Sequence, residues 1–348
     1  MGKNCTNILL FLFSTLTSLI VCELVLKTFE PIRHSFYPRG LFEKDTKFGH
    51  KLSKNFKGIH SFQDYSYKVN TNTIGCFEDE IALDKAEVLV LGDSHTWGYV
   101  QMADRFSNKL RSKYNLNTYN CALTASGTLQ QKHIYEKLFK KGLKPKVIIL
   151  AYNPYNDVEN DILSPEYDVA DGLIFRNKSF GILDNGNLDF NYIKIIPNNF
   201  YRRVKALLHR YSSIYRYSFH LKQKIFNKDE YFYTDTFMLK TKLIYSLNKK
   251  TKKLFDRNIS NVIEFANLSN ENNAKLIIST IPIPEEVCNI SYKKSLNYIF
   301  KRFKDQGISI TDQEICLPQK YFFPINGHLN QNGNSLISEK ISKYLLNN

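Results

Sequence analysis

A serine in a glycine-flanked turn is the clearest chemical signal in this chain. Ser94 lies in the segment Gly92–Gly98 (GDSHTWG), directly after the apolar run 88–91 (VLVL). An apolar run with β-branched members indicates a buried parallel strand, and residues that follow such strands face the crevice in which ligands bind. The pattern therefore predicts a serine nucleophile at the edge of a sheet. The alternative is an ordinary helix cap, in which the hydroxyl only satisfies a backbone amide.

A histidine near the C-terminus could take the proton of that serine. His328 stands in the segment 326–330 (NGHLN), and an amphipathic stretch that reaches Leu346 follows it. An imidazole next to a serine hydroxyl is the usual base of nucleophilic acyl transfer. The alternative for His328 is a surface histidine at a helix start. His95 adjoins Ser94 in sequence, so we expect its ring to point away from the hydroxyl, at the rim of the site.

Acyl transfer also needs hydrogen-bond donors for the oxyanion that develops on the attacked carbonyl. Asn156 follows a second strand-like run, 147–151 (VIILA), and its side-chain amide can donate without carrying charge. The segment 120–127 (NCALTASG) offers a backbone amide at Ala125 or at Gly127. The alternative for Asn156 is a turn pair with Asp157 that caps the next segment.

These four segments, in this order, resemble the sequence blocks of the SGNH (GDSL-type) hydrolases, and in particular the membrane-anchored bacterial type. The resemblance implies an α/β, flavodoxin-like, three-layer α/β/α core with a parallel sheet, plus an N-terminal transmembrane helix and an inserted segment. It also implies that Ser94 attacks an ester and that His328 acts as base and then as acid. The amides of Ser94 and Ala125, with the side chain of Asn156, would hold the oxyanion. No metal or cofactor takes part in this chemistry.

One position departs from the family's pattern. Family members carry an aspartate two or three residues before the histidine, where this chain has Ile325 and Asn326. An aspartate holds the imidazole in the useful tautomer and stabilises the imidazolium, whereas Asn326 could orient the ring only through its neutral carbonyl. Asp312 or Glu314 could supply the charge from the preceding loop. The alternatives are a Ser-His dyad oriented by Asn326, a substitute carboxylate, or a degenerate enzyme.

The N-terminal segment predicts a membrane anchor. Residues 8–26 form an apolar stretch long enough to span a bilayer, with Glu23 as its only charge. A cleaved secretory signal would have a shorter apolar core ending in small residues. Four positive charges follow the stretch and only Lys3 precedes it, which by itself would place the bulk of the chain in the cytoplasm. The resemblance implies the opposite orientation: a single-pass protein of the inner membrane whose catalytic domain is periplasmic.

Three regions follow from these assignments: an anchor at 1–30, a β-rich leader at 31–84, and a hydrolase domain at 85–348 with an insertion at about 158–250. The alternation in 65–69 (YSYKV) predicts a β element in the leader, with a role in packing or at the substrate rim. Two further core strands are expected at 275–280 and 307–310.

The insertion is too long for a simple connection, so we expect it to have structure of its own. Residues 184–187 (DNGN) predict a hairpin turn. Residues 200–211 (FYRRVKALLHRY) have the apolar spacing of a helix with a basic face. That helix could lie on an anionic membrane surface, contact an acidic glycan, or present an ordinary solvated face.

Composition limits the remaining function classes. The chain has 348 residues, of which 43% are hydrophobic, and this is enough for a full core. Its net charge of +15 is dispersed, and no nucleic-acid-binding motif accompanies it, so attraction to acidic lipid or polysaccharide is expected instead of nucleic-acid binding. The six cysteines lack the spacing of a metal site.

The function expected from these observations is that of a membrane-anchored serine esterase or acyltransferase. Its substrate would be O-acyl groups, such as acetyl, on a cell-surface polysaccharide or related glycoconjugate. The alternative, supported by the missing aspartate, is a catalytically inactive SGNH-fold protein that binds a glycan or a partner protein in envelope assembly.

Overall fold

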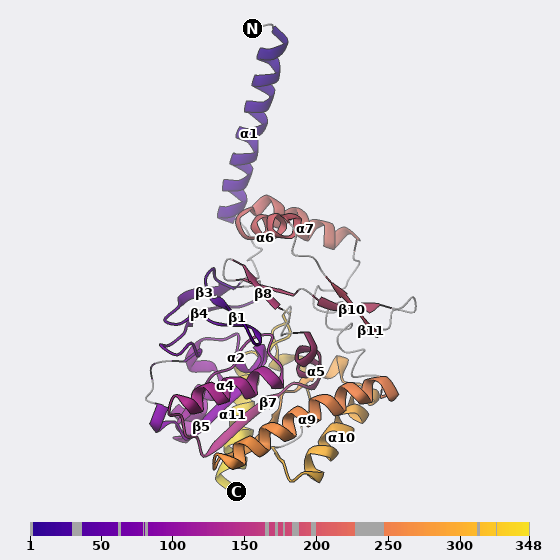
Figure 1. Ribbon diagram of the computed structural model, residues 1–348. Helices are drawn as coiled ribbons and strands as arrows, with labels where there is room; N and C mark the ends of the chain where they lie inside the picture. Colours follow the sequence, from indigo (N-terminus) through magenta and orange to yellow (C-terminus); the bar gives the residue numbers. More distant parts are fainter. Residues whose placement is uncertain are drawn as a thin grey trace. The chain divides into compact units, whose positions relative to one another are not determined.

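The computed structural model describes residues 3–29, 37–61, 64–78, 80, 83–163, 167–170, 173–176, 178–182, 188–195, 200–226, 247–311, 314–324 and 326–347. The chain divides into two compact units. The smaller unit holds α1 (Lys3–Phe29), α6 (Phe200–Tyr211) and α7 (Ser213–Phe226). The larger unit holds the leader from Tyr37 onward except residues 61–63, the central sheet and the helices that cover the sheet (Figure 1).

A five-stranded parallel sheet forms the centre of the larger unit, in the order β14-β12-β7-β5-β6. The strands are β5 (Val88–Gly92), β6 (Thr118–Asn120), β7 (Val147–Tyr152), β12 (Lys275–Thr280) and β14 (Ser309–Ile310). Counted along the chain this is the 2-1-3-4-5 order of flavodoxin-like folds, and the order reverses between β5 and β7. In such sheets ligands bind beyond the carboxyl ends of the strands at this reversal.

The strands predicted at 88–91, 147–151 and 275–280 are confirmed. The strand predicted at 307–310 is shorter, because Gly307 (φ 70°) and Ile308 still close the preceding helix through hydrogen bonds to Lys304 and Phe303. The apolar pattern of this segment therefore belongs partly to a helix end.

Helices cover both faces of the sheet. Leu89 and Leu91 pack toward α4 (Thr128–Lys140), α9 (Lys249–Glu271) and α10 (Ile290–Asp305). Val88 and Val90 pack toward α3 (Phe106–Tyr114) and α11 (Gln331–Asn347). Successive side chains of a strand point to opposite faces, so an uninterrupted apolar strand must be covered on both sides. The expected three-layer α/β/α class is confirmed.

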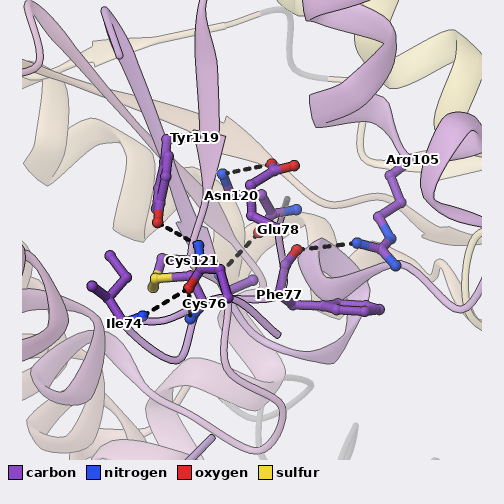
Figure 2. Close-up of a disulfide and its surroundings, with 10 residues drawn as sticks. Ile74, Cys76, Phe77, Glu78, Arg105, Tyr119, Asn120 and Cys121 are labelled. Atoms are coloured by element: carbon purple, nitrogen blue, oxygen red, sulfur yellow. Dashed lines mark hydrogen bonds between the residues drawn. A yellow bond between two sulfur atoms is a disulfide. The ribbon is translucent and has the colours of Figure 1, made fainter. Parts of the chain in front are cut away.

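The leader forms two small sheets and is cross-linked to the core. Strand β1 (Phe42–Asp45) pairs with β2 (Gly49–Leu52), and β3 (Lys57–Ser61) with β4 (Ser66–Asn70), which is the β element expected at 65–69. A disulfide joins Cys76 at the end of the leader to Cys121 after β6 (Figure 2). Beside this disulfide, Arg105 donates to the Phe77 carbonyl at 3.1 Å and its guanidinium lies on the Phe77 ring.

Short elements complete the larger unit. A second disulfide, Cys288–Cys316, lies next to the pairing of β13 (Ile283–Pro284) with β15 (Cys316–Leu317). Two antiparallel pairs follow α5 (Pro154–Leu163): β8 (Tyr167–Ala170) with β9 (Leu173–Arg176), and β10 (Lys178–Ile182) with β11 (Leu188–Ile195). The hairpin turn predicted at 184–187 lies outside the described residues, between β10 and β11.

In the smaller unit α1 contains the predicted span 8–26. Within the described residues it is the one helix long and apolar enough to cross a membrane, with a mean hydropathy of 2.3 over its most apolar window. The side chain of Glu23 accepts hydrogen bonds from the backbone amides of Ser213 (2.5 Å) and Ile214 (3.1 Å). Glu23 therefore caps the start of α7, because these amides have no partner within their own helix. The helix predicted over 200–211 is α6.

Candidate active site

The turn after β5 holds Ser94 at the start of the short helix α2 (Ser94–Trp97). Asp93 caps this helix by accepting from the amide of His95 at 2.8 Å. Gly92 has no room for a side chain, because a Cβ there would lie 2.1 Å from Thr96 Oγ1 and 2.9 Å from the Ala151 carbonyl. The glycine and the aspartate of the heptapeptide thus set the tight turn that presents Ser94, whose side chain is nearly buried.

The structure brings Ser94 and His328 together from positions 234 residues apart. Ser94 Oγ lies 2.9 Å from His328 Nε2, and His328 Nδ1 is hydrogen-bonded to Asn326 Oδ1. Asn326 Oδ1 is an acceptor, so Nδ1 carries the proton and Nε2 keeps a lone pair for the Ser94 hydroxyl. This is the tautomer that a general base requires.

A carboxylate from the leader holds Asn326. Asp64 Oδ2 accepts from the backbone amide of Asn326 at 3.0 Å. Of the two substitutes expected from sequence, Glu314 is elsewhere, in an exposed ion pair with Lys340. The other, Asp312, lies outside the described residues. Sequence reasoning missed Asp64 because 262 residues separate it from Asn326, and no motif marks it.

Aromatic rings enclose the imidazole of His328. The His95 ring stacks on it with centroids 4.1 Å apart, and the Tyr99 ring lies at 4.2 Å. Behind Tyr99, the hydroxyls of Tyr37 and Tyr99 lie 2.5 Å apart. The expected rim position of His95 is therefore wrong, since its side chain is buried and packs face to face with the base. The direction of the His95 side chain is set by this packing against His328 and not by its place in the sequence.

Asn156 reaches the same crevice from the first turn of α5. Its Nδ2 donates to Asp93 Oδ2, and Asn153 Nδ2 also lies 3.4 Å from that oxygen. The side-chain nitrogen of Asn156 has two hydrogens. One is donated to Asp93, and this bond fixes the direction of the second. The turn-pair alternative holds only for Asp157, which accepts from the Asn153 amide at 2.6 Å, whereas the Asn156 side chain reaches Asp93, the residue after β5. Asp93 is a second residue that sequence reasoning did not single out.

The backbone at Ala125 adopts the conformation that a glycine favours. Its φ is +55°, in the left-handed region where alanine is uncommon. Gly127 has a different role: its amide donates to Gln130 Oε1 at 3.1 Å at the start of α4, and a Cβ there would lie 2.5 Å from the Asp161 amide. Of the two positions offered by sequence, Ala125 has the left-handed backbone and Gly127 is the N-cap of α4; the oxyanion role of Ala125 stays a prediction.

The residue after Asn156 is a buried aspartate, Asp157. Burial, followed by the negative charge of Asp93, raises the pKa of Asp157 well above its ordinary value. Asp157 accepts from the Asn153 amide at 2.6 Å and from Gln131 Nε2 at 3.0 Å.

A cleft of about 380 Å³ borders the loop that carries His328. Its walls combine aromatic rings with side-chain carboxamides: Tyr65, Tyr99, Phe323, Gln101, Asn330, Gln331 and Asn332. Tyr99 belongs to both the cleft and the packing around His328, so the cleft adjoins the Ser94–His328 pair. Among the described residues no cluster of three or more His, Cys, Asp or Glu side chains could hold a metal ion.

No model of a known protein family matches the chain. No curated protein matches it either. Among solved structures, it is similar to a lipolytic protein of the G-D-S-L family from Desulfitobacterium hafniense DCB-2, at 10% identity over 74% of this chain and 97% of that chain, with a TM-score of 0.40. It is similar to the psychrotrophic esterase EstA from Pseudoalteromonas sp., at 11% identity over 75% and 98%, with a TM-score of 0.38. It is also similar to the acetyl xylan esterase Est2A from Butyrivibrio proteoclasticus, at 12% identity over 77% and 66%, with a TM-score of 0.39. The matching solved structures include GDSL-type hydrolases, the family that the four sequence segments resemble.

Proposed function

We propose that this chain is a membrane-anchored serine esterase or acyltransferase of the SGNH type. The observation that carries the proposal is the hydrogen-bonded set in which Ser94 Oγ lies 2.9 Å from His328 Nε2 while Asn326 binds Nδ1. A serine hydroxyl bonded to the unprotonated nitrogen of an oriented imidazole is the arrangement that activates a weak nucleophile.

In the proposed reaction, Ser94 Oγ attacks the ester carbonyl carbon while His328 Nε2 takes the hydroxyl proton. The amides of Ser94 and Ala125 and the side chain of Asn156 bind the resulting oxyanion. His328 then protonates the alcohol oxygen as its bond to the carbonyl carbon breaks, leaving an acyl-serine. A water molecule releases the acyl group as a carboxylic acid, or an acceptor hydroxyl takes it, again with His328 as base.

Asn326 and Asp64 together replace the missing aspartate in this proposal. Asn326 keeps the proton on Nδ1 through its carbonyl oxygen, but it places no charge next to the imidazolium. Asp64 Oδ2 accepts from the backbone amide of Asn326 at 3.0 Å, and so a carboxylate lies next to the residue that orients the ring. Asp64 is a positioning residue, because it acts on the base through Asn326.

The cleft beside His328 favours a carbohydrate ester as substrate. Aromatic faces stack on the apolar faces of sugar rings, and carboxamides bind hydroxyl groups through both a donor and an acceptor. Phe323 is the partly exposed ring of the cleft, because Tyr65 and Tyr99 are buried and stack on each other. Gln101 and Asn332 are among its carboxamides, whereas that of Asn330 binds the backbone at and before the start of α11. This combination supports the proposal that the substrate is an O-acyl group, such as acetyl, on a cell-surface polysaccharide.

The two disulfides support an extracytoplasmic position for the larger unit. Disulfides persist in oxidising compartments such as the periplasm and are rare in the cytosol. Cys76–Cys121 and Cys288–Cys316 both lie in this unit, whereas the free Cys5 and Cys22 lie in α1. The proposed topology is therefore a single span in the inner membrane with the catalytic unit outside.

Labelling with a fluorophosphonate serine probe tests the proposal. The full-length protein in detergent should label, and Ser94→Ala and His328→Ala should not, because the first lacks the nucleophile and the second lacks its base. Acetate release from an acetylated polysaccharide then tests the substrate. A folded wild-type protein that neither labels nor releases acetate would favour the second candidate, an inactive glycan-binding protein, for which the neutral Asn326 is the supporting observation.

A further inference from the structure

The smaller unit presents an apolar surface that the proposed reaction does not use. On α6 the exposed apolar side chains are Phe200, Tyr201, Leu207, Leu208 and Tyr211, of which Phe200 is 83% and Tyr211 59% exposed. At 100° per residue these five positions fall within an arc of about 120° on the helix. A face of this width is typical of a helix that packs against an apolar phase.

Five of the seven remaining positions of α6 carry basic residues. Its sequence FYRRVKALLHRY includes four Lys or Arg residues and one His, and no acidic residue. An apolar face opposite a Lys- and Arg-rich face is the pattern of helices that lie in the plane of a bilayer, with the apolar face among acyl chains and the basic residues near anionic headgroups. On α7, Tyr217 and Leu221 are exposed and lie four residues apart, so they share one face.

Glu23 attaches this helical pair to the membrane helix. It accepts from the backbone amides of Ser213 and Ile214 and from Ser212 Oγ at 3.0 Å, at the junction of α6 and α7. Glu23 lies three residues before the end of the predicted span 8–26, or about 4.5 Å of helix rise from it. A carboxylate this near the end of a span places the α6–α7 junction, to which it is bonded, toward the membrane boundary.

We propose that α6 and α7 lie in the interface of the bilayer at the Phe29 end of α1, and that the occupant of their apolar face is an anionic phospholipid membrane. Like this face, the apolar side chains of α1 are exposed along the span.

The test uses the full chain with Cys5→Ser and Cys22→Ser, reconstituted in nanodiscs of phosphatidylcholine and phosphatidylglycerol. An environment-sensitive fluorophore is attached to one added cysteine at a time: Tyr211→Cys on the apolar face, Lys205→Cys on the basic side of the same helix, or Lys85→Cys in the larger unit. Brominated lipid should quench the label at Tyr211 several-fold more than at Lys205 and leave Lys85 unaffected. Omitting phosphatidylglycerol should weaken the quenching at Tyr211.

Two further results bear on the proposal. Glu23→Gln should lower the quenching at Tyr211, because the amide binds the α7 amides less strongly than the carboxylate does. Equal quenching at Tyr211 and Lys205, or none at Tyr211, would overturn the proposal. Protection of the Tyr211 label by an added acidic polysaccharide such as alginate in detergent, without quenching in nanodiscs, would overturn it in favour of a glycan surface. None of these readouts depends on esterase activity.

Discussion

The nucleophile and the base of the candidate site are held by different kinds of structure. Ser94 is set by its own neighbours: the buried strand β5, the side-chain-free Gly92 and the cap by Asp93. His328 is set by distant parts of the chain, including Asn326 on its own loop, Asp64 from the leader and the Tyr99 ring. A seven-residue motif can encode the local geometry around Ser94. It cannot encode the position of His328, which depends on contacts with distant segments.

Without the family's aspartate, the base side of the candidate site can still receive a carboxylate. The base side is assembled through tertiary contacts, so a charged group can enter from another segment without altering the motif around His328. On the nucleophile side the same freedom does not exist, because a Cβ at position 92 would overlap Thr96 and the Ala151 carbonyl.

Removing the leader's disulfide should damage the base side most. Cys76→Ala with Cys121→Ala opens a link between residues 45 apart. From loop-closure entropy in the unfolded chain, this link is expected to stabilise the fold by about 4 kcal/mol. The matched control, Cys288→Ala with Cys316→Ala, opens a 28-residue link of similar entropy away from the leader. Thermal midpoints should fall in both variants, but fluorophosphonate labelling below the midpoint should fall mainly in the first. Equal labelling would show that the leader does not support the base.

Asn156→Ala should lower kcat/KM by about 10²–10³-fold, the usual effect of losing one oxyanion donor. The loss should appear in kcat, because the donor acts on charge that develops only in the transition state. Initial rates of ester hydrolysis over a range of substrate concentrations would measure it, with the thermal midpoint as a check on folding. A change confined to KM would instead make Asn156 a substrate-binding residue.

Asp64→Asn tests the carboxylate alone, because the amide oxygen can still accept from the Asn326 backbone. We expect kcat/KM to fall on the order of tenfold, or about 1.4 kcal/mol in the barrier. The acid limb of its pH profile should move to lower pH, since the imidazolium loses a stabilising charge.

The matched background is Asn326→Asp, which restores a carboxylate at the family's position. In that background Asp64→Asn should cost little or raise the rate, because two adjacent carboxylates repel. Equal losses in both backgrounds would mean that Asp64 has only a structural role.

Two buried histidines should make the stability of the larger unit depend on pH. Burial lowers the pKa of His60 to about 3 and that of His50 to about 4. As pH falls from 6.5 toward 4, the unfolded chain binds protons at both histidines and the native state does not. The free energy of unfolding should therefore fall, by up to about 1.4 kcal/mol per pH unit for each histidine. Urea titrations in detergent should show a shallower decline for His60→Phe, and an unchanged slope would contradict this account.

Much of the fold followed from patterns that are local in the chain. The apolar runs at 88–91 and 147–151 lack polar alternation, which requires cover on both faces, and the structure confirms the three-layer sheet. The helix over 200–211 was equally predictable, since 3.6-residue spacing is visible without any tertiary information. His95 was misplaced because the direction of a side chain in a tight turn depends on what packs around it.

By itself, the sequence determined the turn that presents Ser94, the strands that feed it, the apolar span and the order of the candidate segments, because each depends on the chemistry of adjacent residues. Only the tertiary structure decided that Asp64 reaches Asn326, that Asp93 orients Asn156, and that Glu23 caps α7. These contacts join residues 262, 63 and 190 positions apart. Hydrogen bonds between such partners depend on how the strands, loops and helices pack, and no spacing in the sequence records that packing.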